Sequence, residues 1–215
     1  MSGASPISIA ILLYDGVTAL DVVGPYEVLT RLPSAEVQVL APGHGTVRDG
    51  AGVMTWWPER SLEMLPDPDV IVVPGGPGVE AACSDREIVE WLRAAHQTAR
   101  WTTSVCTGAM LLGSAGLLRG RRATTHWLAL DRLTDYGARP RQRRVVVDEP
   151  IITAAGVSAG IDMALTLAGR LAGDEAAQAI QLSLEYAPRP PYTSGSPRTA
   201  PAEIVSRVRA IAQVR

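Results

Sequence analysis

Short apolar runs alternate with segments of helical spacing along almost the whole chain. The first run, ISIAILL at residues 7–13, has the length and composition of a buried strand. It is followed at 22–32 by VVGPYEVLTRL, whose apolar residues recur with helical spacing despite the internal Gly-Pro pair. Further strands are predicted at 35–42, 69–78 (running into a glycine turn), 101–105, 121–126, 144–148 and 151–156, a hairpin at 45–57, and helices at 85–98, 108–118, 127–133, 158–171, 174–187 and 201–213.

This alternation predicts an α/β fold. Strands separated by helices of about 10–15 residues are typical of βαβ units, in which helices cover both faces of a parallel sheet. We therefore expect a mostly parallel central sheet with helices on both faces. No repeat is visible and no boundary divides the chain, so a single domain is predicted over residues 1–215.

The composition supports a globular protein with a sizeable core. Apolar residues make up 47% of the chain and charged residues 20%, and the formal net charge is −2. This charge gives no general reason to bind nucleic acid or an anionic membrane, so we expect neither partner. Two basic runs, at 119–122 and 139–144, are interpreted as solvated surface.

The start of the chain and the cysteines indicate a cytoplasmic protein. No basic segment precedes the first apolar run, and this run is too short for a secretion signal or a membrane span. The two cysteines, Cys83 and Cys106, are too few for a disulfide framework, and neither has a histidine or cysteine at the spacing of metal ligands. We expect free thiols and no metal.

A glycine motif at 76–81, GPGVEA, loosely matches a dinucleotide-binding fingerprint after a predicted strand. It lies in the middle of the chain rather than in the first βα unit, and Pro77 removes a backbone donor from the turn. No acidic residue stands at the required distance. The motif is therefore interpreted as a turn whose free N–H groups serve another purpose.

A second motif, GVSAG at 156–160, matches the nucleophile elbow of serine hydrolases. Those enzymes place the histidine of the triad after the serine, whereas every histidine of this chain precedes Ser158. Ser158 is therefore interpreted as the N-cap of the helix that follows.

Cys106 is the strongest candidate for a nucleophile. It lies at the carboxyl end of the strand predicted at 101–105, the edge at which open α/β sheets bind ligands, and it precedes a helix whose amino end favours a thiolate. Gly108 permits a tight turn there. The alternative is that Cys106 is a small buried apolar residue, as most free cysteines are.

Three groups are candidate partners of this thiol. Asp21 follows the first strand at the same edge, where it either exchanges a proton with Cys106 or caps the next helix. His126 ends another short strand and either orients reacting groups or caps the helix predicted at 127–133. The turn at Gly75–Gly76 is placed to donate an amide to a developing negative charge.

Several segments together resemble a known family. They are ALDVVGPYEVL, VPGG, SVCTGAMLLGSAGLLRGRRATTHW, GVSAGIDMALTLAGRL and the tail QLSLEYAPRPPYTSGSPRTAP. In this order they resemble the ThiJ/PfpI superfamily, the flavodoxin-like relatives of class I glutamine amidotransferases. Within it, the first segment, SVCTG and the tail are most similar to the isonitrile (isocyanide) hydratases.

The resemblance implies a flavodoxin-like, homodimeric, cofactor-free enzyme that adds water to an isocyanide and releases an N-substituted formamide. By the same resemblance Cys106 is the nucleophile that forms a thioimidate, and Asp21 supplies a proton and later positions water. Thr107 holds the intermediate through its hydroxyl or amide, and the Gly76 amide belongs to the anion-stabilising turn. The helix that begins near Val157 packs beside the cysteine.

Two other functions remain open. Similar domains form the ligand-sensing half of AraC-type transcription regulators, which continue into a helix-turn-helix domain. This sequence stops at Arg215 after one predicted helix, so we expect an enzyme rather than a regulator. A redox-sensing or protein-repair role of Cys106 is the other alternative, because a reactive thiol also oxidises. Peptide hydrolysis is disfavoured, because the peptidases of the superfamily carry His directly after the cysteine and this chain carries Thr107.

Overall fold

A computed structural model describes residues 6–58 and 60–212. The chain divides into two compact units, Met1–Leu184 and Glu185–Arg215. A single domain is predicted over 1–215, and its first five and last three residues lie outside the described residues. The end of the helix predicted at 201–213 lies outside them as well.

Within the described residues of the first unit, one seven-stranded sheet has the order β10-β11-β7-β6-β1-β2-β5. All neighbouring pairs are parallel except β10 with β11. The mostly parallel sheet predicted from the sequence is thus confirmed. Its strands are β1 (Ile7–Leu12), β2 (Ala35–Ala41), β5 (Arg60–Ser61), β6 (Val70–Val73), β7 (Trp101–Val105), β10 (Val145–Asp148) and β11 (Ile151–Ala154).

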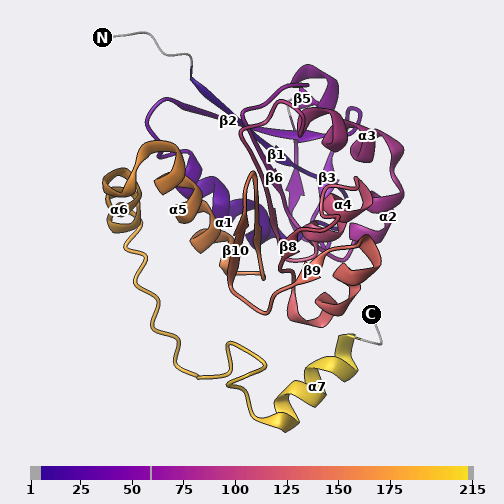
Figure 1. The fold of residues 1–215 in the computed structure, drawn as a ribbon, viewed down its shortest axis with the longest axis vertical. Coiled ribbons are helices and arrows are strands. Elements are labelled where there is room, and N and C mark those ends of the chain that lie inside the picture. Colours follow the sequence, from indigo (N-terminus) through magenta and orange to yellow (C-terminus); the bar gives the residue numbers. More distant parts are fainter. Residues whose placement is uncertain (1–5, 59, 213–215) are drawn as a thin grey trace. The chain divides into compact units, whose positions relative to one another are not determined.

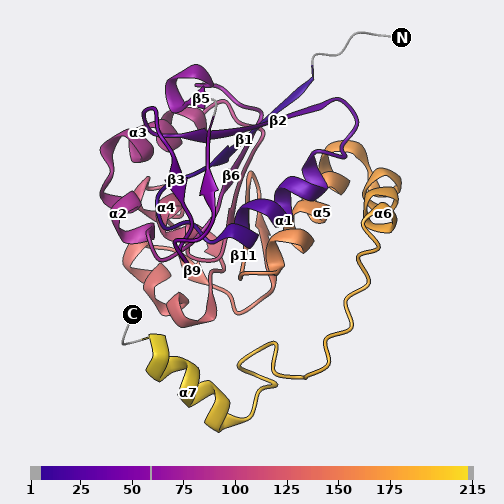
Figure 2. The ribbon, with the colours of Figure 1, turned by 180° about the vertical axis from the view of Figure 1, so that it is seen from behind.

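Helices cover both faces of this sheet, as Figures 1 and 2 show from opposite sides. One layer contains α1, α5 and α6, and the other contains α2, α3 and α4. Because both faces are covered, the central strands are buried on both sides: β6 reads as a continuous apolar run, whereas β7 also buries Thr102, Thr103 and Ser104. The helices are α1 (Ala19–Leu29), α2 (Val79–Ser84), α3 (Arg86–Ala95), α4 (Gly108–Ser114), α5 (Ala159–Ala172) and α6 (Asp174–Ser183), with 3-10 turns η1 (Leu62–Met64), η2 (Trp127–Ala129) and η3 (Asp131–Tyr136).

Small residues bring α1 and α5 close together. A Cβ added at Gly24 of α1 would stand 3.1 Å from the side chain of Ile161, and one at Gly160 of α5 would stand 3.2 Å from that of Val105. Pro25 also lies at this contact, because its ring is 3.3 Å from the same added Cβ at Gly160. The middle of α1 and the end of β7 are consequently held at one place beside α5.

Several predicted boundaries differ from the structure. Helix α1 begins at Ala19, three residues before the predicted start, and α4 ends at Ser114 instead of residue 118. The helix predicted at 127–133 is wrong in type, because this segment forms the 3-10 turns η2 and η3. The hairpin at 45–57 is confirmed as the antiparallel pair of β3 (Val47–Arg48) and β4 (Thr55–Trp56), and the strand predicted at 121–126 is reduced to β8 (Arg122–Ala123), which pairs with β9 (Arg139–Pro140).

The second unit contains the polar, proline-rich segment after α6 and the helix α7 (Ala202–Ala212), which has no buried residue. Its apolar side chains Ile204, Val208 and Ile211 are 39–51% exposed. Of the described helices, none has the length and hydropathy that crossing a membrane requires.

Candidate active site

Four chain segments meet at the carboxyl edge of the central strands. They are the start of α1 after β1, the loop after β6, the turn from β7 into α4, and the loop from β11 into α5. They carry Asp21, Gly75–Gly76, Cys106 with Thr107, and Gly156 with Val157, respectively. Because parallel strands end at the same edge, residues far apart in the sequence are brought together here.

Cys106 occupies a strained turn between β7 and α4. Its φ angle is +55°, a left-handed value that costs a non-glycine residue on the order of 1–3 kcal/mol. The peptide groups on both sides of it are fixed: its N–H donates to the carbonyl of Ala154 (3.0 Å) and its carbonyl accepts from the hydroxyl of Thr125 (2.6 Å). These bonds hold the thiol at the edge of the sheet, where it is 6% exposed.

Two glycines make room for this turn. Gly156 has φ +134°, and a Cβ added there would stand 3.0–3.1 Å from Cα, Cβ and Sγ of Cys106. A Cβ added at Gly75 would stand 2.5 Å from the backbone nitrogen of Thr107. Any larger residue at either position would therefore displace the turn that carries the thiol.

Asp21 lies in the first turn of α1 and is fully buried. Its Oδ2 accepts the N–H of Gly75 at 3.0 Å, whereas its buried Oδ1 has no hydrogen-bond partner of normal geometry among the described residues. Thr18 holds the N-cap position of α1. The alternative that Asp21 caps this helix is therefore wrong, and its carboxyl group bonds to the Gly75 loop instead.

The carboxyl group of Asp21 and the thiol of Cys106 form a coupled pair. Burial raises the pKa of Asp21 to about 7, although the Gly75 N–H and the Cys106 side chain act in the opposite direction. Burial and the charge of Asp21 together raise the pKa of Cys106 to about 12. The amino end of the short helix α4, which favours a thiolate, does not outweigh these effects. At neutral pH the resting pair therefore holds the thiol beside a carboxyl group that titrates near pH 7.

Thr107 connects the thiol to the glycine turn. Its Oγ1 accepts the N–H of Gly76 at 3.0 Å, so in this resting structure the Gly76 amide holds the Thr107 hydroxyl. The backbone N–H and the hydroxyl of Thr107 both act to lower the pKa of the Cys106 thiol, because both stabilise a charge on sulfur. The groups that stabilise an anion at Cys106 are thus those of Thr107, with Gly76 orienting them.

His126 and Val157 each follow directly a residue that contacts Cys106, namely Thr125 and Gly156. His126 is half-buried, and its Nδ1 accepts the N–H of Leu128 (3.4 Å), so it caps the turn η2. Burial lowers the pKa of this imidazole, which is therefore neutral at pH 7. Val157 is half-buried beside Gly156, and its carbonyl accepts the N–H of Gly160 (3.4 Å). Ser158 stands at the N-cap position of α5 as expected but forms no capping hydrogen bond.

Sequence reasoning missed three residues that support the cluster. Gly156 was visible only as part of the serine-elbow pattern, and Thr125 only as part of ATTH. Tyr14 ends the first strand segment and carried no signal at all, although its hydroxyl donates to the carbonyl of Pro74 (2.9 Å) in the loop beside Asp21. All three contacts join residues distant in the sequence, so no local pattern could reveal them.

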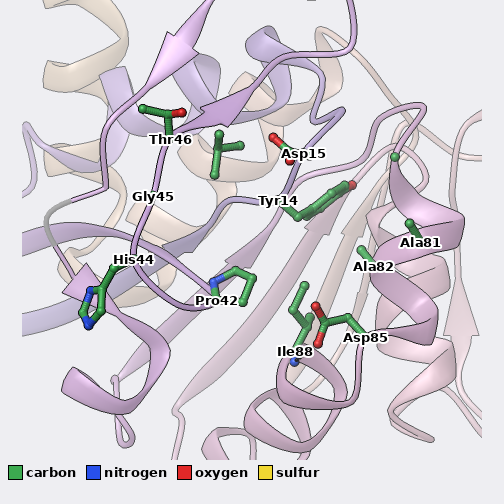
Figure 3. A pocket seen from close by; sticks show the side chains of 12 residues that line it. Tyr14, Asp15, Pro42, His44, Gly45, Thr46, Ala81, Ala82, Asp85 and Ile88 are labelled. Carbon is green, nitrogen blue, oxygen red and sulfur yellow. Dashed lines mark hydrogen bonds between the residues drawn. The ribbon is translucent and has the colours of Figure 1, made fainter.

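A cavity of about 250 Å³ is lined on one side by Tyr14 (Figure 3). It is lined among others by Asp15 and Asp85, but both carboxylates already accept backbone N–H groups, from Arg48 and from the first turn of α3. Cys106 and Asp21 do not line it. Among the described residues, no group of three or more His, Cys, Asp or Glu side chains is arranged to hold a metal ion.

The chain is similar to several known proteins in sequence and in structure. The model of the DJ-1/PfpI family matches residues 7–170. The chain is 46% identical over 203 residues to the isonitrile hydratase of Pseudomonas putida, covering 94% of this chain and 89% of that protein. It is 32% identical over 192 residues to the HTH-type transcriptional regulator GbdR of Pseudomonas aeruginosa, of which it spans about half the length (51%). The crystal structure of a ThiJ/PfpI family protein from Pseudomonas syringae superposes with a TM-score of 0.94 at 37% identity, covering 97% of this chain and 87% of that one.

Proposed function

The chain belongs to the DJ-1/PfpI family, and on that premise we propose that it hydrates an isocyanide to an N-substituted formamide through a thioimidate on Cys106. The observation that carries this proposal is the 46% identity to an isonitrile hydratase over almost the whole of both chains. The buried pair of Cys106 and Asp21 supplies the chemistry that this reaction needs.

The first step joins the thiol to the substrate. The sulfur of Cys106 attacks the terminal carbon of the isocyanide, and the Asp21 carboxylate takes the thiol proton and passes it to the same carbon. One S–H bond breaks while one S–C bond and one C–H bond form, which gives a thioimidate with no change in charge. The unpartnered Oδ1 of Asp21 is the atom available for this proton.

The second step uses one water molecule. Asp21 orients the water against the thioimidate carbon, a C–O bond forms, and the nitrogen receives a proton. The C–S bond then breaks, the formamide leaves and the sulfur regains its proton. The N–H and hydroxyl of Thr107 stabilise negative charge at sulfur during both steps, and the glycine turn at Gly75–Gly76 holds Asp21 and Thr107 in position.

This mechanism predicts how the rate depends on pH. The carboxylate form of Asp21 accepts the thiol proton, and the pKa of this group is about 7. The value of kcat/KM therefore rises with pH through about 7 and reaches a plateau above it, because kcat/KM reports the ionisation of the free enzyme. A profile that falls through this range would contradict the role of Asp21 as the proton acceptor.

The experiment that tests the proposal measures formamide release from a simple aromatic isocyanide, followed by absorbance. We expect turnover by the wild-type chain, none by Cys106→Ala or Asp21→Asn, and unchanged turnover by Cys83→Ala. Cys83 is the matched control, because it is half-buried on α2 and its neighbours are Ser114 and Tyr136 rather than the site. A folded, reduced protein without turnover would favour the ligand-sensing function, for which the similarity to GbdR is the supporting observation.

We further propose that the enzyme is a homodimer in the cytoplasm that has no cofactor and does not bind nucleic acid. Two free cysteines and a slightly acidic net charge support the compartment and the lack of nucleic-acid binding. Sedimentation equilibrium tests the assembly: a homodimer has twice the chain mass of 22.8 kDa.

A further inference from the structure

The peptide unit that joins Pro74 to Gly75 is hydrogen-bonded at both ends. Its carbonyl oxygen accepts the phenol O–H of Tyr14 at 2.9 Å, and its N–H donates to Oδ2 of Asp21 at 3.0 Å. The two bonds form a continuous chain from the Tyr14 hydroxyl through one amide to the Asp21 carboxyl group. No other hydrogen bond to the Asp21 carboxyl has normal geometry among the described residues, so this amide is its principal anchor.

The surroundings make this chain rigid. Tyr14 lies two residues after the end of β1 and is 3% exposed, so its hydroxyl has no competition from bulk water. The Pro74 carbonyl packs against the backbone of Gly108, where an added Cβ would stand 2.7 Å from its oxygen. The carbonyl of Gly75 accepts the N–H of Thr18, which fixes the loop to the start of α1. The direction of the Gly75 N–H is therefore set by packing on several sides.

The titratable groups around Asp21 are few. Cys106 faces it from the turn after β7, and Tyr14 lies close enough that the charges of Asp21 and Cys106 both raise the pKa of its phenol. Cys83 of α2 contributes to the same effect on Tyr14. Because burial raises the phenol pKa further, Tyr14 keeps its proton and remains a donor throughout the pH range in which Asp21 titrates.

We propose, resting on the hydratase function proposed above, that Tyr14 is a positioning residue that sets the proton affinity of Asp21 through the Pro74–Gly75 peptide. A hydrogen bond to an amide carbonyl withdraws electron density from the nitrogen and makes its N–H a stronger donor, an effect on the order of 10–30% per bond. A stronger N–H stabilises the carboxylate over the carboxylic acid. Tyr14 thereby keeps Asp21 ionised at a lower pH than burial alone would allow, although it touches neither the thiol nor the reacting carbon.

The test is Tyr14→Phe, which removes the hydroxyl and keeps the ring. We expect the rise of kcat/KM with pH to occur at higher pH than in the wild type. Below pH 7 the rate should then be about two- to tenfold lower, and on the plateau it should approach the wild-type rate. Tyr136→Phe is the matched control, because Tyr136 bonds to Ser114 away from Asp21. A loss of rate by the same factor at every pH would show a merely structural role and would overturn the proposal.

A second readout is independent of hydratase activity. The rate at which iodoacetamide alkylates Cys106 is measured by intact mass in the Cys83→Ala background, because protonation of Asp21 removes a negative charge beside the thiol. We expect a step near pH 7 that Tyr14→Phe moves to higher pH. This measurement separates the two proposals. If the protein has no turnover but the step moves in Tyr14→Phe, the role of Tyr14 stands and only the hydratase function is refuted. If the step does not move, the role of Tyr14 is refuted.

A third variant covers the case in which Tyr14→Phe does not fold. Replacement of Tyr14 by 3-fluorotyrosine keeps the hydrogen bond but makes the phenol a stronger donor. We expect the alkylation step to move to lower pH, opposite to the direction expected for Phe. A step that stays in place, or one that moves to higher pH, overturns the proposal.

Discussion

At the scale of single residues, the site depends on a carboxyl group buried where water cannot stabilise its charge. Asp21 is fully buried, and a single N–H of the Gly75 loop provides its hydrogen bond of normal geometry. Burial therefore dominates, and the pKa of the group rises from 3.8 to about 7. The same burial that makes Asp21 a useful proton acceptor near neutral pH also makes its charged form costly for folding.

This cost gives a prediction for stability. Because the pKa of Asp21 is higher in the folded than in the unfolded chain, its stabilising contribution is full below about pH 4 and is lost as pH rises through about 7. The loss amounts to up to about 4 kcal/mol. Asp21→Asn carries no charge at any pH, so we expect its free energy of unfolding to exceed that of the wild type at pH 8 while its turnover is lost.

Urea unfolding of both proteins at pH 5 and pH 8 measures this difference. The difference in the free energy of unfolding between Asp21→Asn and the wild type should be larger at pH 8 than at pH 5. If this free energy changes equally in both proteins between the two pH values, Asp21 is not the group responsible. Asp85→Ala is a useful comparison, because Asp85 is an ordinary N-cap of α3 and its replacement by Ala should lower the free energy of unfolding at both pH values.

At the scale of elements, the strained turn after β7 depends on what packs against it. Cys106 keeps its left-handed backbone because Ala154 of β11 and Thr125 after β8 bond to its two peptide groups. The loop from β11 into α5 must also approach the thiol closely, which only glycine permits at residue 156. The turn is thus a product of three segments rather than of the sequence around the cysteine.

Gly156→Ala tests this dependence. The added methyl would meet Cα, Cβ and Sγ of Cys106 at 3.0–3.1 Å, on a backbone with φ +134° that alanine rarely adopts. We expect kcat/KM to fall on the order of 100-fold, since a shift of about 1 Å in a reacting group costs this much. The variant should also unfold at a lower temperature, because backbone strain of this kind costs about 1–3 kcal/mol.

Gly173→Ala is the matched control for Gly156→Ala. Gly173 also has a positive φ angle, +87°, but a Cβ added there would meet no heavy atom within 4 Å. This variant should lose stability through its backbone and keep its activity when it is folded. Equal losses of activity in both variants would show that the contact with Cys106 is unimportant.

At the scale of the whole molecule, the hydrophobic core belongs to the first compact unit, and residues 185–215 (the tail) form the second. Every buried apolar residue of the described chain lies between Ile9 and Ile180, within the first compact unit. Helix α7 of the second unit buries none of its residues. The first unit therefore contains the hydrophobic contacts that stabilise the sheet and the site.

Removal of residues 185–215 tests this separation. We expect the shortened chain, 1–184, to keep the circular dichroism of the α/β unit and a cooperative thermal transition. Its melting temperature should lie within a few degrees of the full-length value, because no residue of α7 is part of the core. A chain that fails to fold without the tail would show that the tail contributes buried surface in solution.

The sequence determined the fold class and predicted that Cys106 and Asp21 lie together at one edge of the sheet, where the structure places them. Continuous apolar runs such as 7–13 separated by helical spacing are sufficient for a parallel sheet, because this periodicity is a local property of the chain. Cys106 and Asp21 were identified from their positions after predicted strands. The helix at 127–133 was predicted incorrectly, because helical spacing over seven residues does not distinguish an α-helix from the 3-10 turns that form there.

The tertiary structure alone decided the burial, the backbone conformation and the proton affinity of these groups. The burial of Asp21, the left-handed backbone of Cys106 and the contacts of Gly156, Thr125 and Tyr14 all arise between segments that are far apart in the sequence. Proton affinity depends on desolvation and on nearby donors, which exist only once those segments have packed together. The sequence thus predicted which side chains form the candidate site, and packing determined their proton affinities.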